Sequence, residues 1–153
     1  MKKILFGLFL GAVGLTSCSG KKIIPDGSDR VTKNNISIWS SWVKNKSDKF
    51  DVRLHIANDS EKDVIILLSE MHCFRGTIRG ELKHTFFNTG ERTIDFRPRE
   101  TKEFNLVCRT NENAEGDFKI VVGHVYANPQ GDGKTRGDAI AKDLEWKVVD
   151  AKN

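Results

Sequence analysis

Cysteine and histidine are the residue types in this chain that offer the widest choice of chemistry. The 153 residues contain three cysteines, Cys18, Cys73 and Cys108, and four histidines. A cysteine thiol can be acylated, oxidised to a disulfide or bound to a metal. The chain has no Cys-x-x-Cys pair and no two histidines at the spacing of a tetrahedral zinc site. We therefore predict no metal site and no catalytic residue, and we assign the cysteines to covalent roles.

The residues before Cys18 indicate which of these roles it takes. Met1-Lys2-Lys3 is positively charged, and Ile4 to Leu15 is an uncharged run of apolar residues and glycine that ends three positions before Cys18. A helix needs roughly twenty residues to cross a bilayer, so this run is too short for a permanent span. A positive start followed by a short apolar run is typical of a secretory signal. Residues 1–17 are therefore predicted to be a signal peptide.

The four residues Leu15, Thr16, Ser17 and Cys18 match a lipobox, which is a leucine, a small residue, a Gly, Ala or Ser, and then the cysteine. In this segment the chain resembles bacterial lipoproteins. The resemblance implies that the Cys18 thiol carries a diacylglycerol group, that the mature chain begins at Cys18 and that its new amino group is acylated. Two or three acyl chains make a membrane anchor effectively permanent. No other cofactor is expected.

The residue after the lipidated cysteine bears on the membrane that is chosen. It is Ser19 rather than aspartate, and in the lipoproteins of many two-membrane bacteria this implies transfer to the outer membrane. We therefore expect a cell-envelope protein that faces the periplasm. In an exported chain, the remaining pair of cysteines, Cys73 and Cys108, predicts a disulfide. Closing a loop of this length stabilises a fold by roughly 3 to 4 kcal/mol in the chain-entropy model.

The charge of the mature chain excludes one class of partner. The signal peptide holds two lysines and no acidic residue, which leaves 23 basic against 21 acidic residues. A nucleic-acid-binding domain usually carries a strong basic excess. We therefore expect no nucleic-acid partner.

Turn-forming residues follow the lipobox, and alternating patterns begin later. Residues 18–33 are rich in Gly, Pro, Asp and Ser, and we predict a lipidated tether there. Residues 34–150 then form one domain, within which Phe50 to Ala57 alternates most clearly between apolar and polar side chains. Asp117 to Tyr126 alternates over a longer stretch and places His124 and Tyr126 on one face with Phe118. Further strands are predicted at residues 36–43, 64–68, 82–87, 93–97, 101–108 and 144–149.

These patterns define the fold class. Seven to eight short strands, with no long amphipathic helix, predict an all-β protein: an antiparallel immunoglobulin-like β-sandwich. The segment Pro98 to Thr101 before Phe104, and the segment Gly116 to Phe118 before the long strand, resemble the corresponding region of bacterial immunoglobulin-like domains.

Loops on a rigid sandwich often carry recognition, and the longest loop predicted here is Asn128 to Gly137. Arg97 and Arg99 lie in a stretch with a small basic excess. Trp39 and Trp42 are three residues apart, so in a regular strand they point to opposite faces, which leaves one of them exposed for a partner. The candidate binding residues are Arg97, Arg99, Trp42, Asn128, Asp132, Lys134 and Arg136.

Three interpretations of function follow. The first is a non-enzymatic binding module, tethered by lipid, for a protein or an anionic envelope polymer. The second is an envelope hydrolase or metal-assisted enzyme whose site draws on His72, His84 or His124, although no familiar catalytic motif is present. The third is a subunit of an envelope secretion or assembly complex.

Overall fold

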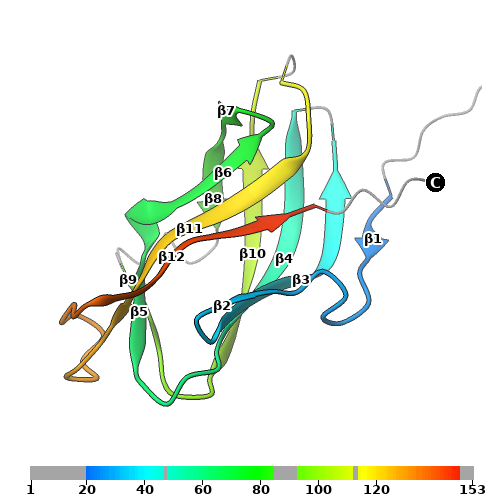
Figure 1. The fold of residues 1–153 in the computed structure, drawn as a ribbon. Helices are drawn as coiled ribbons and strands as arrows, with labels where there is room; N and C mark the ends of the chain where they lie inside the picture. Colours follow the sequence, from blue (N-terminus) through cyan, green and yellow to red (C-terminus); the bar gives the residue numbers. More distant parts are fainter. Residues whose placement is uncertain (1–19, 47, 85–92, 112–113, 149–153) are drawn as a thin grey trace, which may run out of the picture.

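The computed structural model describes residues 20–46, 48–84, 93–111 and 114–148, and these form two antiparallel sheets packed face to face (Figure 1). The predicted all-β sandwich is therefore confirmed. One sheet, called sheet A, contains β1 (Lys22–Ile23), β2 (Val31–Lys33), β3 (Ile36–Asn45), β4 (Lys49–Asn58), β8 (Glu81–His84) and β10 (Thr101–Arg109). The other, sheet B, contains β5 (Val64–Leu67), β6 (Met71–Arg75), β7 (Ile78–Arg79), β9 (Thr93–Phe96), β11 (Phe118–Ala127) and β12 (Ala139–Lys147).

The strand order explains why the described residues form twelve strands where seven to eight were predicted. In sheet A, β1 and β2 pair with different parts of β3, and β4, β10 and β8 follow. In sheet B, β12 pairs with one side of β11, and β6 and β5 pair in succession with the other. A short 3-10 helix, η1 (Leu68–Glu70), separates β5 from β6. Each of the two long strands β3 and β11 thus pairs along one side with two short strands, β1 and β2 in sheet A and β5 and β6 in sheet B.

The core lies between the sheets and follows the predicted alternation. Phe50, Val52, Leu54 and Ile56 of β4 are fully buried and face the core side chains of β11. Burying each such side chain stabilises the fold by about 1.5–3 kcal/mol. Trp146 of β12 is also fully buried, and its ring lies 6.5 Å from that of Phe50.

Residues 22–33 differ from the tether that was predicted for 18–33. β1 pairs with Trp42 and Val43, and β2 pairs with Ile36 to Ile38, so this segment forms the edge of sheet A. The physical reason is that side chains of this segment accept hydrogen bonds from residues of β3. A composition rich in turn formers does not reveal such bonds. The folded domain therefore begins near Lys22 rather than at Asn34.

Asp29 is the main such side chain. Its carboxylate accepts hydrogen bonds from the backbone N and the Oγ of Ser40, and from Nε1 of Trp146 at 2.8 Å. Ser40 belongs to sheet A and Trp146 to sheet B, so this one carboxylate bridges the two sheets at the side where β3 and β12 lie. Without it, the buried indole N–H would lack an acceptor, which costs about 1–3 kcal/mol.

The two tryptophans of β3 correct a second prediction. Trp39 pairs with His55 and Trp42 pairs with Arg53, and both partners point away from the core. A β-bulge between Ser40 and Trp42 inserts one extra residue, which shifts the alternation by one position. Both tryptophans therefore lie on the outer face of sheet A, instead of on opposite faces.

The long strand β11 has a similar irregularity. Val122 and Val125 are both fully buried, so the inner face changes phase between them, and His124 and Tyr126 lie on the outer face rather than beside Phe118. The register with β12 shifts between Val125 and Tyr126. The alternation therefore predicted the strand but not the direction of its last two polar side chains.

The predicted disulfide between Cys73 and Cys108 is present, and it joins β6 to β10 through the core. Gly80 packs directly against it: a Cβ at this position would lie 2.7 Å from the Cys108 Sγ and 3.0 Å from the Cys73 Sγ. Real Cβ atoms almost never approach so closely, so only glycine fits here without a shift.

Candidate binding site

Three connections meet at one end of the sandwich, which we call the loop end: residues 59–63 between β4 and β5, 97–100 between β9 and β10, and 128–138 between β11 and β12 (Figure 1). Two buried asparagines hold them together. Asn58 Nδ2 donates to the carbonyl oxygens of Lys62 at 2.7 Å and Arg97 at 2.9 Å. The backbone N of Asn128 donates to the carbonyl oxygen of Asp63 at 2.8 Å. The loop end is therefore a tied unit.

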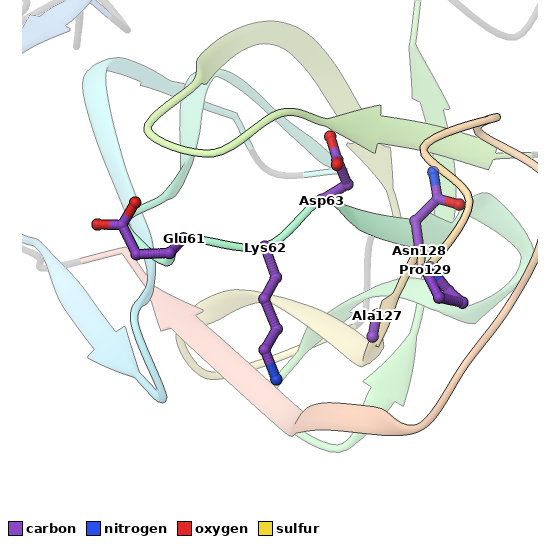
Figure 2. A pocket seen from close by; sticks show the side chains of 6 residues that line it. All are labelled: Glu61, Lys62, Asp63, Ala127, Asn128 and Pro129. Atoms are coloured by element: carbon purple, nitrogen blue, oxygen red, sulfur yellow. The ribbon is translucent and has the colours of Figure 1, made fainter.

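An open groove of about 340 Å³ lies at this end. Figure 2 shows that two chain segments line it. The lining residues are Glu61, Lys62, Asp63, Ala127, Asn128 and Pro129. Acidic, basic and apolar groups thus lie side by side, a combination that suits contact with a mixed polar surface better than the enclosure of an apolar small molecule.

Asp132 shapes the far part of the 128–138 loop. Its carboxylate accepts hydrogen bonds from the backbone N of Lys134 at 2.8 Å, and from the backbone N and the Oγ1 of Thr135, both at 2.7 Å. These donors, those of Thr135 first, lower the pKa of Asp132 from 3.8 to about 2. The side chain therefore orders the turn from within.

Asn128 orders the same loop from its base. The residue is only 3% exposed. In the amide orientation that gives both side-chain atoms hydrogen-bond partners, the Asn128 side-chain nitrogen donates to the Thr135 carbonyl oxygen and to the Asp132 carboxylate. The side-chain oxygen then accepts from the Gly133 N. A buried amide with this many partners positions a loop and offers little surface to a binding partner.

The last part of the loop is attached to the outer face of sheet B. The Arg136 guanidinium lies 4.9 Å from the centre of the Tyr126 ring, and the Tyr126 hydroxyl donates to Glu70 at 3.0 Å. His124 Nδ1 lies 2.7 Å from the same carboxylate. Burial, and then the hydrogen bond to Glu70, raise the pKa of Tyr126. This cluster joins the loop to η1 through charge and aromatic stacking.

Arg99, in the turn between β9 and β10, and Lys102, at the start of β10, have acidic neighbours. The Arg99 guanidinium pairs with Glu61 on the rim of the groove. Lys102 Nζ lies 3.6 Å from Asp95 and 3.8 Å from Glu100. Exposed pairs of this kind contribute little stability, but they offset the local positive charge. The loop end therefore presents mixed charges instead of a single basic face.

Most of the predicted binding residues meet at this end. Arg97, Arg99, Asn128, Asp132, Lys134 and Arg136 all lie in the loops that form it. Trp42 does not: it is half-buried on the outer face of sheet A, with Lys21 Nζ 4.4 Å from its ring centre. Two other arginines, Arg75 in β6 and Arg79 in β7, lie away from the β9–β10 turn.

Sequence reasoning missed the other wall of the groove. Glu61, Lys62 and Asp63 lie in the polar stretch between the predicted strands at 50–57 and 64–68, and nothing in that pattern shows that they face the end of β11. A signal was available in Asn58, a polar residue that closes an alternating apolar strand. Asparagine is frequent where a side chain must bond to the backbone of a following turn.

The histidines have separate surroundings. His72 Nδ1 lies 2.9 Å from the Arg79 guanidinium, and His124 contacts Glu70. His84 belongs to β8, and its side chain lies outside the described residues. In the part of the chain that the structure describes, no group of three or more His, Cys, Asp or Glu residues is arranged to hold a metal, and no helix is long and apolar enough to cross a membrane. Cys18 and the predicted signal peptide lie outside that part.

The fold and the tied loops define a two-sheet β-sandwich with a grooved end. No protein-family model matches this chain, and no curated protein sequence does. Among solved structures, the chain is similar to a Bacillus subtilis protein described as a lipoprotein, ycdA, with a TM-score of 0.52 and 11% sequence identity. The similarity covers 78% of this chain but only 38% of the B. subtilis chain. At this identity the likeness concerns the fold alone.

Proposed function

We propose that this chain is a lipid-anchored lipoprotein of the cell envelope whose sandwich domain binds a partner at its loop end. The lipobox ending in Cys18 supports the anchor. The description of the B. subtilis structure as a lipoprotein is compatible with it. The Ser19 that follows the cysteine favours the outer membrane, with the domain in the periplasm.

The observation that carries the binding role is the groove between residues 61–63 and 127–129. Its walls are held by buried asparagines and by Asp132, so the loop that forms one side is ordered before a partner arrives. A preorganised loop lowers the entropic cost of binding. The mixture of charges favours a folded protein partner over a uniformly anionic polymer, because such a polymer requires a continuous basic surface.

The strand order supports the immunoglobulin-like interpretation of this fold. One sheet contains β3, β4, β10 and β8 in that order, and the other contains β5 with β6, then β11 and β12. This matches the ABED and CFG arrangement of immunoglobulin domains. The loop end then corresponds to the end at which such domains commonly present binding loops.

The anchor and the binding site are tested in one set of strains. The full-length protein carries a C-terminal tag, and two variants are compared with it in the native envelope: Cys18→Ser, and a chain in which a short Gly-Ser turn replaces residues 128–137. We expect Cys18→Ser to leave the membrane fraction. The loop variant is expected to stay there and to remain folded, with a lower melting temperature because the hydrogen bonds of Asn128 are lost, but it should no longer capture the crosslinked partner.

Two results would contradict the proposal. The proposed anchor is wrong if Cys18→Ser remains in the membrane fraction and its mature mass is not lower than that of the natural chain by the mass of the lipid. If the loop variant captures the same partner as the natural chain, the binding site lies elsewhere.

A further inference from the structure

The connection between the proposed anchor and the folded domain is short. β1 begins at Lys22, four residues after Cys18. A fully extended chain spans at most about 3.6 Å per residue, so Lys22 lies no more than roughly 14 Å from the lipidated cysteine. A domain held this closely has little freedom to move away from the bilayer, and the surface around β1 must lie next to it. This placement of β1 depends on the proposed lipid anchor at Cys18.

The surface around β1 has the chemistry of a membrane contact. Ile23 is 67% exposed, which is the highest exposure among the large apolar side chains of the described residues. It follows Lys21 and Lys22 directly, and Lys21 lies over the ring of Trp42. Apolar and tryptophan side chains with neighbouring lysines are typical of residues at the membrane interface.

More lysines lie where β3 and β4 meet. Lys22 pairs with Val43 across the strands, which places Lys21 next to Lys44, and Lys46 follows in the turn. Nearby acidic groups are Asp48 and Asp51, of which Asp51 is paired with Lys49 at 3.7 Å. Five lysines therefore stand against two aspartates. We call this surface the anchor corner; it comprises Lys21, Lys22, Ile23, Trp42, Lys44, Lys46 and Lys49.

The anchor corner lies toward the end of the domain opposite to the groove. Ile36, at the start of β3, pairs with Asn58 at the loop end, whereas β1 pairs with Trp42 and Val43 farther along the same strand. Six residues of strand span roughly 20 Å. Figure 1 shows β1 beside the second half of β3, with the β4–β5 and β9–β10 connections at the far end.

From these placements we infer that the anchor corner rests on an anionic lipid surface, with Ile23 at the level of the headgroups and the loop end directed away from the membrane. Lysines near an anionic surface gain electrostatic attraction that decays within about one Debye length. The short connection supplies that proximity. The groove is thereby presented to the space beyond the membrane instead of being covered by it.

The test measures the depth of three single positions in the full-length lipidated protein. Ile23→Cys, Val31→Cys and Gln130→Cys are each labelled with a fluorescent probe and reconstituted in vesicles of phosphatidylethanolamine and phosphatidylglycerol that contain a lipid with a nitroxide headgroup. Val31 is the matched control, because it is an exposed apolar residue of the same edge but pairs with Ile38 nearer the loop end. Gln130 reports on the loop end itself.

We expect the nitroxide lipid to quench the probe at position 23 several-fold more strongly than the probe at 130, with position 31 in between. Replacing phosphatidylglycerol with a zwitterionic lipid is expected to weaken quenching at 23. Equal quenching at 23 and 130, or no dependence on lipid charge, overturns the inference. A labelled protein that does not stay with the vesicles any better than Cys18→Ser contradicts the proposed anchor instead, so the two failures are distinguishable.

Discussion

At the scale of single residues, a few polar side chains with several hydrogen-bond partners position the two sheets and the loops of the loop end. The side chains of Asp29 and Asn58 join segments that are distant in the sequence, and the side chain of Asn128 ties together its own loop. A buried donor or acceptor that loses its partner costs more than an exposed hydrogen bond contributes. Substitutions at these residues are therefore expected to have larger effects than changes among the exposed charges.

Asp29 allows a direct test of this expectation. Asp29→Ala removes the acceptor of the buried Trp146 indole and of the Ser40 backbone. We expect the free energy of unfolding to fall by about 1–3 kcal/mol, measured by urea denaturation. Glu115→Ala, at an exposed position, is the control and should change it by less than about 0.5 kcal/mol. Equal effects of the two substitutions would show that Asp29 does not bridge the sheets.

Asp132 makes a prediction about pH. Because its folded-state pKa is lowered from 3.8 to about 2, the ionised carboxylate supports the loop above pH 3.8, and that support is lost as the pH falls through about 2. An NMR titration of the Asp132 carboxyl carbon should show this low pKa. Asp132→Asn should speed amide exchange at Lys134 and Thr135 at neutral pH. A midpoint near the ordinary value would mean that the turn is not held by this side chain.

Gly80 tests the packing around the disulfide. A methyl group at this position would press on both sulfur atoms and on the Arg109 carbonyl oxygen, 2.7 Å away. Overpacking of this kind typically costs 1–3 kcal/mol, so we expect Gly80→Ala to lower stability by about that amount. In a Cys73→Ala, Cys108→Ala background the cost should shrink, because the sulfur atoms are gone. An unchanged cost would assign the effect to the backbone contact.

At the scale of elements, sequence patterns predicted the strands that are regular and missed those that depend on distant partners. The alternation of Phe50 to Ala57 was enough to locate β4, because one face of that strand is buried along its whole length. β1 and β2 are short and exposed, so their residues carry no alternating signal. The part of the strand predicted over 82–87 that follows His84 lies outside the described residues.

Irregularities explain the errors in side-chain direction. The bulge in β3 and the phase change in β11 each alter the alternation by one residue. No glycine or proline marks the bulge at Ser40 to Trp42, whereas Gly123 lies within the phase change of β11. The same limit applies to the site. The long loop was recognised from its glycines, but its partners at residues 61–63 depend on the order of strands in sheet B, which no local pattern contains.

The edge formed by residues 22–33 can be tested by truncation. A chain that begins at Asn34 loses β1, β2, Asp29 and the segment whose Arg30 and Asp26 contact Trp39. We expect its free energy of unfolding to be lower by about 3 kcal/mol or more than that of a chain beginning at Gly20, because Trp39 becomes exposed and the Trp146 indole loses its acceptor. Identical denaturation midpoints would restore the interpretation of this segment as a tether.

At the scale of the whole molecule, the two ends of the domain have different tasks in this account. The end near β1 follows the proposed lipid anchor at Cys18, and the loop end carries the groove. The sandwich between them, joined by the disulfide and by Asp29, fixes the distance and direction of the one relative to the other. A rigid body of this kind places a binding loop at a set height above a bilayer without any need for a long linker.

Site-specific photo-crosslinking in the native envelope tests the proposed binding role of the loop end most directly. A photoreactive amino acid replaces Gln130 at the loop end or Ile78, an exposed apolar residue of β7, in the lipidated full-length protein. We expect one discrete crosslinked product from position 130, absent from position 78 and lost when Cys18→Ser removes the proposed anchor. A product that forms equally from both positions, or no product from position 130 at all, would contradict the proposed binding role.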